Sequence, residues 1–209
     1  MASKIQTIFD TITAHLRQQG KRAYDNFANA CAYRTTDRYE HELKCAAGCL
    51  IPDDAYWAAG SNIEGNLALE IHVKWPNIYG DNVSPVGTKD WEEEMALIRV
   101  MQQIHDTLNE EVWEEYWQTT ANSFGLEFTP NRALRDMSSS LPDLETPTRK
   151  YGEQCVREEI ASCLYGIKVD GQLAAQEGRS LEANPFTPSG FHDAWAEGWK
   201  SALIAEKPA

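Results

Sequence analysis

The chain has 209 residues, of which 42% are hydrophobic and 24% are charged, the composition of an ordinary globular protein rather than of a disordered or fibrous one. Its 32 acidic residues outnumber its 19 basic residues, so the net charge is −13. A protein this acidic gains nothing from releasing the counterions of a polyanion, which argues against broad binding to nucleic-acid backbones. The first residues lack a signal-peptide pattern, and no stretch approaches the roughly 18 apolar residues of a spanning helix. We therefore expect a soluble, intracellular protein that does not enter the membrane.

Hydrophobic residues at helical spacing predict a helix over residues 3–19, with Ser3 as its N-cap and Gly20 at its end. The following segment is less regular, and its short apolar runs predict two short strands near residues 31–34 and 43–45. After these strands, a proline and two aspartates favour the start of a short helix at Pro52, Asp53 and Asp54.

Apolar and polar residues alternate over residues 67–75, which predicts a half-buried strand. A helix is the alternative, because Ala68, Leu69 and Glu70 are good helix formers. Turn-forming residues then predict a loop over residues 76–85.

Asp90 is expected to be the N-cap of a long helix, which ends near Asn109. Its apolar face consists of Leu97, Met101, Ile104 and Leu108. A second helix ends at Gly125, and its inward side chains are predicted to be Trp113, Trp117 and Phe124.

Prolines and serines give residues 127–148 the composition of a linker, which makes this segment the expected domain boundary. Pro147 suits a first helical turn, so a helix is predicted over residues 147–168. Two shorter helices are expected over residues 170–178 and 189–206.

The negative charge is concentrated in one part of the chain. Residues 91–126 contain 8 acidic side chains and 1 basic side chain, a local charge of −7. The acidic side chains that we predict to bind a partner, together with the adjacent tryptophan, are Trp91, Glu92, Glu93, Glu94, Glu110, Glu111, Glu114 and Glu115. Such a surface could dock on a basic protein groove that otherwise binds phosphates. The alternative is structural, since acidic residues in first turns stabilise helix dipoles.

Five cysteines, an odd number, argue against a disulfide framework, and we expect free thiols. Cys31, Cys45 and Cys49, with His41 and His72 nearby in sequence, are weak candidates for a zinc site. Burial of the thiols as small hydrophobes is the alternative that we favour, and no metal or cofactor is predicted. The same residues could also form a cysteine nucleophile with a histidine base, although no local signature supports it.

Two pairs of residues adjacent in sequence, His105 with Asp106 and His192 with Asp193, are of the types that perform acid–base chemistry. Neighbouring residues on a helix do not face one another, so neither pair is expected to form a dyad. The sequence also lacks phosphate-binding, dinucleotide-binding, zinc-protease and hydrolase motifs. We therefore expect no catalytic residues.

The string Lys44-Cys-Ala-Ala-Gly-Cys-Leu-Ile-Pro-Asp53, together with Cys31-Ala-Tyr-Arg34 upstream and Gln103-Ile-His-Asp106 downstream, resembles a group of uncharacterised phage and prophage proteins. The resemblance spans about the first 126 residues. It implies a viral origin and action in a bacterial cytoplasm, but no reaction.

A second resemblance covers about the last 40 residues. Gly171-Gln-Leu-Ala-Ala-Gln-Glu-Gly-Arg179, then Asn184-Pro-Phe186 and Ala194-Trp-Ala-Glu-Gly-Trp199, are similar to the ribosome modulation factor family. This similarity implies a helical hairpin. Family members that bind ribosomal RNA are strongly basic, whereas this segment is acidic, so the fold is expected without clear RNA binding.

These observations predict a mainly helical α+β protein with three parts: a domain at residues 1–126 with a small sheet, a linker or extended crossing at 127–148, and a helical module at 149–209. The predicted function is a phage-encoded, non-catalytic inhibitor that binds a basic host protein or a nucleic-acid-handling defence complex, in the manner of an anti-CRISPR protein or a nucleic-acid mimic. One alternative is a ribosome- or RNA-associated modulator that uses the C-terminal module. Another is a metal-dependent enzyme.

Overall fold

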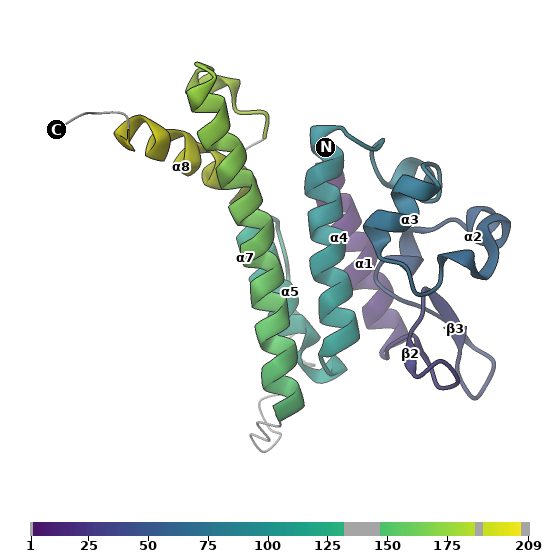
Figure 1. Cartoon of the computed structure of the whole chain (residues 1–209). Helices are drawn as coiled ribbons and strands as arrows, with labels where there is room; N and C mark the ends of the chain where they lie inside the picture. Colours follow the sequence, from purple (N-terminus) through teal and green to yellow (C-terminus); the bar gives the residue numbers. More distant parts are fainter. Residues whose placement is uncertain (1, 132–146, 187–189, 206–209) are drawn as a thin grey trace.

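A computed structural model describes residues 2–131, 147–186 and 190–205 of the chain. The fold is α+β and mainly helical (Figure 1). Its five longer helices are α1 (Lys4–Gln19), α4 (Lys89–Thr107), α5 (Trp113–Phe124), α7 (Pro147–Gln176) and α8 (Gly190–Ala205). Among the described residues, no helix is long and apolar enough to cross a membrane.

Helix α1 has the boundaries that its sequence predicts. The Ser3 hydroxyl accepts a hydrogen bond from the Gln6 amide, and Gly20 ends the helix in the left-handed conformation with φ = 67°. The Gly20 amide donates to the Leu16 carbonyl, as expected of a glycine C-cap.

Two antiparallel two-stranded sheets follow α1. Strand β1 (Tyr24–Asp25) pairs with β2 (Ala30–Cys31), and β3 (Arg34–Thr36) pairs with β4 (Glu42–Lys44). The strand predicted near residues 31–34 is divided, because Cys31 belongs to β2 of the first hairpin, whereas Arg34 belongs to β3 and pairs with Lys44 of β4. The first of these hairpins was not predicted from the sequence.

The short helix predicted after Pro52 is present as α2 (Asp53–Ala59). The prediction of a strand over residues 67–75 is wrong, because this segment contains the helix α3 (Ala68–Lys74). Its Glu70 side chain accepts a hydrogen bond from the Leu67 amide, and Ala68 and Ile71, one turn apart, are both buried. The N-terminal cap and a buried helical face therefore outweigh the alternating pattern.

Helix α4 begins one residue before the predicted cap, because the Thr88 hydroxyl, not Asp90, accepts a hydrogen bond from the Trp91 amide. The break near Asn109 and the end at Gly125 are confirmed. The predicted inward residues of α5, Trp113, Trp117 and Phe124, are buried.

Helix α7 is continuous over 30 residues, so the prediction of separate helices over 147–168 and 170–178 is wrong. Gly171 does not interrupt it. Instead, a Cβ atom at Gly171 would lie 2.0 Å from the Trp195 carbonyl oxygen, and one at Gly198 would lie 1.9 Å from the Lys168 carbonyl oxygen. These two glycines let the backbones of α7 and α8 approach closely, and the two helices form a hairpin.

The hairpin of α7 and α8 packs against the N-terminal part of the chain. Helix α7 lies along α4, with Val156 and Ile160 buried, and the Phe124 ring of α5 contacts the Phe191 ring of α8 at 4.9 Å between centroids. One hydrophobic core therefore includes both predicted domains. Most of the predicted linker, residues 132–146, lies outside the described residues.

Candidate functional site

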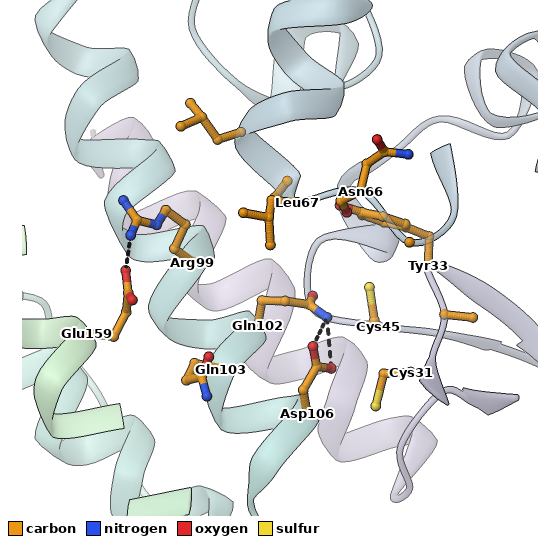
Figure 2. A pocket seen from close by; sticks show the side chains of 14 residues that line it. Cys31, Tyr33, Cys45, Asn66, Leu67, Arg99, Gln102, Gln103, Asp106 and Glu159 are labelled. Carbon is orange, nitrogen blue, oxygen red and sulfur yellow. Dashed lines mark hydrogen bonds and ion pairs between the residues drawn. The ribbon is translucent and has the colours of Figure 1, made fainter. Parts of the chain in front are cut away.

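A cavity of about 440 Å³ lies between the first hairpin, the turn into α3, and helices α4 and α7. Figure 2 shows the amide, carboxylate and thiol groups that line it. Helix α4 contributes Arg99, Gln102, Gln103 and Asp106, and α7 contributes Glu159. Residues 31–33 and 65–69, with Cys45, complete the wall. The cavity thus joins segments from both predicted domains.

Asp106 is the centre of the hydrogen bonds at one end of this cavity. Its carboxylate accepts from the Gln102 amide at 2.8 and 2.9 Å. Nδ1 of His105 lies 2.6 Å from Oδ1 of Asp106, and Nε2 of His105 accepts from the buried Ala23 amide at 3.0 Å. Because Nε2 is an acceptor, the ring proton is on Nδ1 and is donated to Asp106.

The expectation that His105 and Asp106 do not face each other is therefore wrong, because the Asp106 carboxylate turns back to its neighbour's ring. The contact does not create a general base. The nitrogen that would take a proton, Nε2, is already bonded to the Ala23 amide inside the core. His192 and Asp193 also lie close, with 3.3 Å between Nδ1 and Oδ1, at the surface of α8.

The thiols near the cavity are held in their protonated form. Burial, and secondarily the Asp106 carboxylate, raise the pKa of Cys31 to about 12. Burial also raises the pKa of Cys49 to about 12 and that of Cys45 well above its usual value. All five cysteines are free thiols. Because the thiolate is the nucleophile, the raised pKa values disfavour nucleophilic attack by these thiols at neutral pH, and the geometry gives no support to the cysteine nucleophile considered from the sequence.

The residues considered for zinc are not brought together as a set. Cys45 and Cys31 line the cavity, whereas the Cys49 thiol donates to the Ala46 carbonyl at 3.2 Å. His41 is exposed beyond β3, and both ring nitrogens of His72 are bonded, to Trp91 and to the Pro76 carbonyl.

A different set of potential ligand atoms does converge. One atom each of Cys31, His105 and Asp106 lies within 4.8 Å of the others. Coordination through Nδ1 of His105 would move its proton to Nε2, opposite the Ala23 amide proton, and leave two donors face to face. The hydrogen bonds of this set thus fit a structural role better than a metal site.

Three of the seven glutamates predicted to form a docking surface are buried. Glu94 accepts hydrogen bonds from the Ser84 amide and hydroxyl at 2.5 and 2.7 Å. Glu114 pairs with Arg17, and Glu93 is buried with one carboxylate oxygen that has no hydrogen-bond partner among the described residues. Glu94 and Glu114 therefore stabilise the fold through these contacts, whereas the burial of Glu93 destabilises it. None of the three carboxylates is exposed for binding to a partner.

The remaining four do not share one surface. Glu92 lies in the first turn of α4, whereas Glu110 and Glu111 lie in the 3-10 turn before α5 and Glu115 in the first turn of α5, beyond the far end of α4. A helix of 19 residues is about 28 Å long, so the two groups are widely separated. Glu92 pairs with Lys89 and Glu110 with Arg22. Glu111 and Glu115 are the two exposed members of the set.

The Trp91 side chain, which the sequence predicts to bind a partner, makes a structural contact. Its indole Nε1 donates to Nδ1 of His72 at 2.9 Å, and its half-buried ring packs on the core. This hydrogen bond joins α4 to α3. The sequence alone could not show it, because the two partners are 19 residues apart and neither forms part of a recognisable motif.

No family model, no curated protein and no solved structure matches this chain.

Proposed function

We propose that the chain is a non-catalytic inhibitor, encoded by a phage, which binds a host protein or a nucleic-acid-handling defence complex. The observation that carries the proposal is that large aromatic side chains are more than 60% exposed, among them Phe27, Tyr39 and Trp57. Aromatic residues supply much of the binding energy at protein interfaces, and exposing them to water has no benefit for folding.

The chemistry of the cavity supports binding over catalysis. The Cys31 thiol is protonated, His105 has both nitrogens bonded, and Asp106 accepts hydrogen bonds from two side chains. Each of these groups holds the first hairpin or α4 in place. A phage origin is supported by the resemblance of residues 44–53 and their surroundings to phage and prophage proteins.

Fewer acidic side chains are available to bind a partner than the sequence suggests. Glu111 and Glu115 remain available for a basic partner surface, and exposed charges of this kind mainly accelerate association. The alternative ribosomal function has less support, because the described charges of α8 and the turn before it include Glu182, Asp193 and Glu197. Such charges repel RNA phosphates.

The test is affinity capture by the full-length chain from a lysate of a bacterial host, followed by purification of the captured protein and calorimetric titration. An unrelated protein of similar net charge serves as the control for electrostatic capture. We expect a stoichiometric complex at physiological salt and inhibition of the partner's activity. Capture of nothing beyond what the acidic control retains would contradict the proposal.

The acidic contribution is tested separately with the purified partner. Glu115→Gln is expected to slow association and to reduce its dependence on salt, with little change in dissociation. Asp54→Asn, an exposed acidic residue in the first turn of α2, is the matched control. Equal association rates for both variants would exclude a role for this part of the surface.

A further inference from the structure

The tip of the first hairpin presents an aromatic side chain to solvent. Phe27 lies between β1 and β2, and its side chain is fully exposed. The Asp25 carboxylate accepts hydrogen bonds from the Phe27 amide at 2.8 Å and from the Ala28 amide at 3.2 Å. Asn29 completes the turn with φ = 54°, and its side chain accepts from the Tyr24 hydroxyl at 2.7 Å. Hydrogen bonds therefore fix the backbone of the tip, whereas the Phe27 side chain is exposed to solvent.

The tip of the second hairpin is built in the same way. The Asp37 carboxylate accepts hydrogen bonds from the Tyr39 amide at 2.8 Å and from the His41 amide at 2.9 Å. Glu40 has φ = 64°, and the Tyr39 side chain is 61% exposed. In both tips an aspartate fixes the amide two residues later, and that residue is the exposed aromatic.

The two tips belong to neighbouring hairpins. Strand β1 contacts β3, and the Ala32 amide between the hairpins donates to the Ala23 carbonyl at 2.9 Å. The Lys21 ammonium, which precedes β1, pairs with Asp37 at the base of the second tip. Figure 1 shows β2 and β3 at the end of the molecule opposite α8.

We propose that the tips of these two hairpins, residues 25–30 and 37–41, are the docking element of this protein, and that their partner is a protein with apolar pockets for Phe27 and Tyr39. This inference rests on the proposed function and names the surface that performs it. Fixing the backbone that carries an exposed aromatic side chain before binding reduces the entropy lost on binding, and the two aspartates fix it at Phe27 and Tyr39.

The positive charge beside Tyr39 indicates which groups should surround the partner's pocket for this ring. The Arg38 guanidinium lies 4.7 Å from the centroid of the Tyr39 ring, is exposed, and has no ion pair among the described residues. An arginine stacked on an exposed aromatic ring suits a pocket with carboxylates at its edge. A lipid surface is the other class of partner that takes exposed aromatic tips, but the tips carry Asp25, Asp37 and Glu40 against Arg38, and a tip with net negative charge is repelled by anionic bilayers.

Photo-crosslinking in the host cell tests the docking element. A benzophenone amino acid is placed at position 27, 39 or 165 of the full-length chain, where Tyr165 on α7 is the control because it is 69% exposed. We expect positions 27 and 39 to crosslink to the same host protein and position 165 to give no such product. Crosslinks from 27 and 39 to unrelated proteins, or only to lipid, would overturn the inference.

Affinity for the purified crosslinked protein gives the second measurement. Phe27→Ala is expected to weaken binding at least about 30-fold, as truncation of an interface hot spot does, while Tyr165→Ala changes it less than about twofold. Asp25→Ala should weaken binding about tenfold, whereas Asp25→Asn, which keeps the accepting oxygen, should bind nearly as the wild type does. Equal effects of the two Asp25 substitutions would contradict the role given to the turn.

The outcomes separate this inference from the proposed function. A captured host protein that binds the Phe27→Ala variant and a Phe27→Ala, Tyr39→Ala double variant as tightly as the wild type would overturn the docking element but leave the inhibitor proposal standing. Failure of the wild type to capture any partner, together with binding to vesicles of phosphatidylcholine and phosphatidylglycerol, would overturn both.

Discussion

Arg17 and Glu114 form a two-point ion pair across the interface of α1 and α5. Nε and Nη2 of Arg17 lie 2.5 and 2.8 Å from the two carboxylate oxygens, and Glu114 is 5% exposed. The same carboxylate accepts from the Asn131 amide, and Nη2 of Arg17 also donates to the Thr129 carbonyl. The pair therefore fixes the segment after α5 as well as the two helices.

Glu114→Gln should lower the free energy of unfolding by about 2 kcal/mol, because it leaves a partly buried guanidinium without its counter-charge. Urea denaturation at pH 7 measures the change. Glu115→Gln is the matched control, since this neighbour is exposed and should alter stability by no more than about 0.5 kcal/mol. Equal destabilisation by both variants would contradict the role of the pair.

Glu93 should make the protein less stable as the pH rises. Burial, with the charges of Asp90 and Glu94, raises the pKa of Glu93 to about 7, from 4.5 for the free group. Between these two values the folded chain binds more protons than the unfolded chain, so the free energy of unfolding falls across that pH window.

Glu93→Gln should remove this loss and be more stable than the wild type at pH 8, by up to about 3 kcal/mol, with little difference at pH 4. Denaturant unfolding at a series of pH values measures it, and Glu92→Gln, whose carboxylate is half exposed beside Lys89, is the control. Parallel pH curves for the wild type and Glu93→Gln would show that the carboxylate is solvated.

Asp106 should control the reactivity of Cys31. Burial is the main cause of the high Cys31 pKa, and the Asp106 carboxylate is the next. Asp106→Asn is expected to increase alkylation of Cys31 by iodoacetamide several-fold at pH 8.5, because it removes a negative charge that disfavours the thiolate. Mass spectrometry of the labelled peptide gives the rate.

Two controls accompany this measurement. Glu159→Gln, at the α7 side of the same cavity, should leave the Cys31 rate unchanged. Cys45, which is 1% exposed, should remain unlabelled in both variants, and its labelling would indicate that the fold had opened. An unchanged Cys31 rate in Asp106→Asn would show that burial alone protects the thiol.

The glycines at the crossing of α7 and α8 should not tolerate alanine. Gly171→Ala would place a methyl group 2.0 Å from the Trp195 carbonyl oxygen, a backbone atom that cannot rotate away. We expect a loss of about 3 kcal/mol or more in unfolding free energy, or separation of the two helices.

Gly166→Ala is the matched control in the same helix. Among the described residues, no atom beyond the local backbone of α7 lies within 4 Å of a Cβ built at Gly166, so alanine should stabilise α7 by about 0.5–1 kcal/mol. Thermal unfolding compares the two variants. Similar melting temperatures for both would mean that the crossing is wider than described.

Local chemistry made several elements predictable. The cap at Ser3, the left-handed turn at Gly20 and the apolar stripes of α1 and α5 depend on neighbouring residues, so periodicity and capping rules locate them. Residues 67–75 show where such rules fail, because their alternating pattern suits a half-buried strand, and the Glu70 cap and the helical packing of Ile71 decide otherwise.

The candidate site depended on contacts between distant residues. The proximity of Cys31 to Asp106, or of Trp91 to His72, leaves no trace in the spacing of either partner along the chain. The hairpin tips are an exception that the sequence analysis missed. Aspartate followed two residues later by an aromatic, in Asp25-Asn-Phe27 and Asp37-Arg-Tyr39, is a local signal for a fixed turn with an exposed ring.

The sequence by itself determined the helical character, most helix ends and the concentration of charge between residues 91 and 126, because each follows from the identity and spacing of nearby residues. Only the tertiary structure decided which of those charges face water. Glu114 and Glu115 are adjacent in sequence, yet the first is buried against Arg17 and the second is exposed, because successive residues on a helix point about 100° apart and only one of these two faces α1.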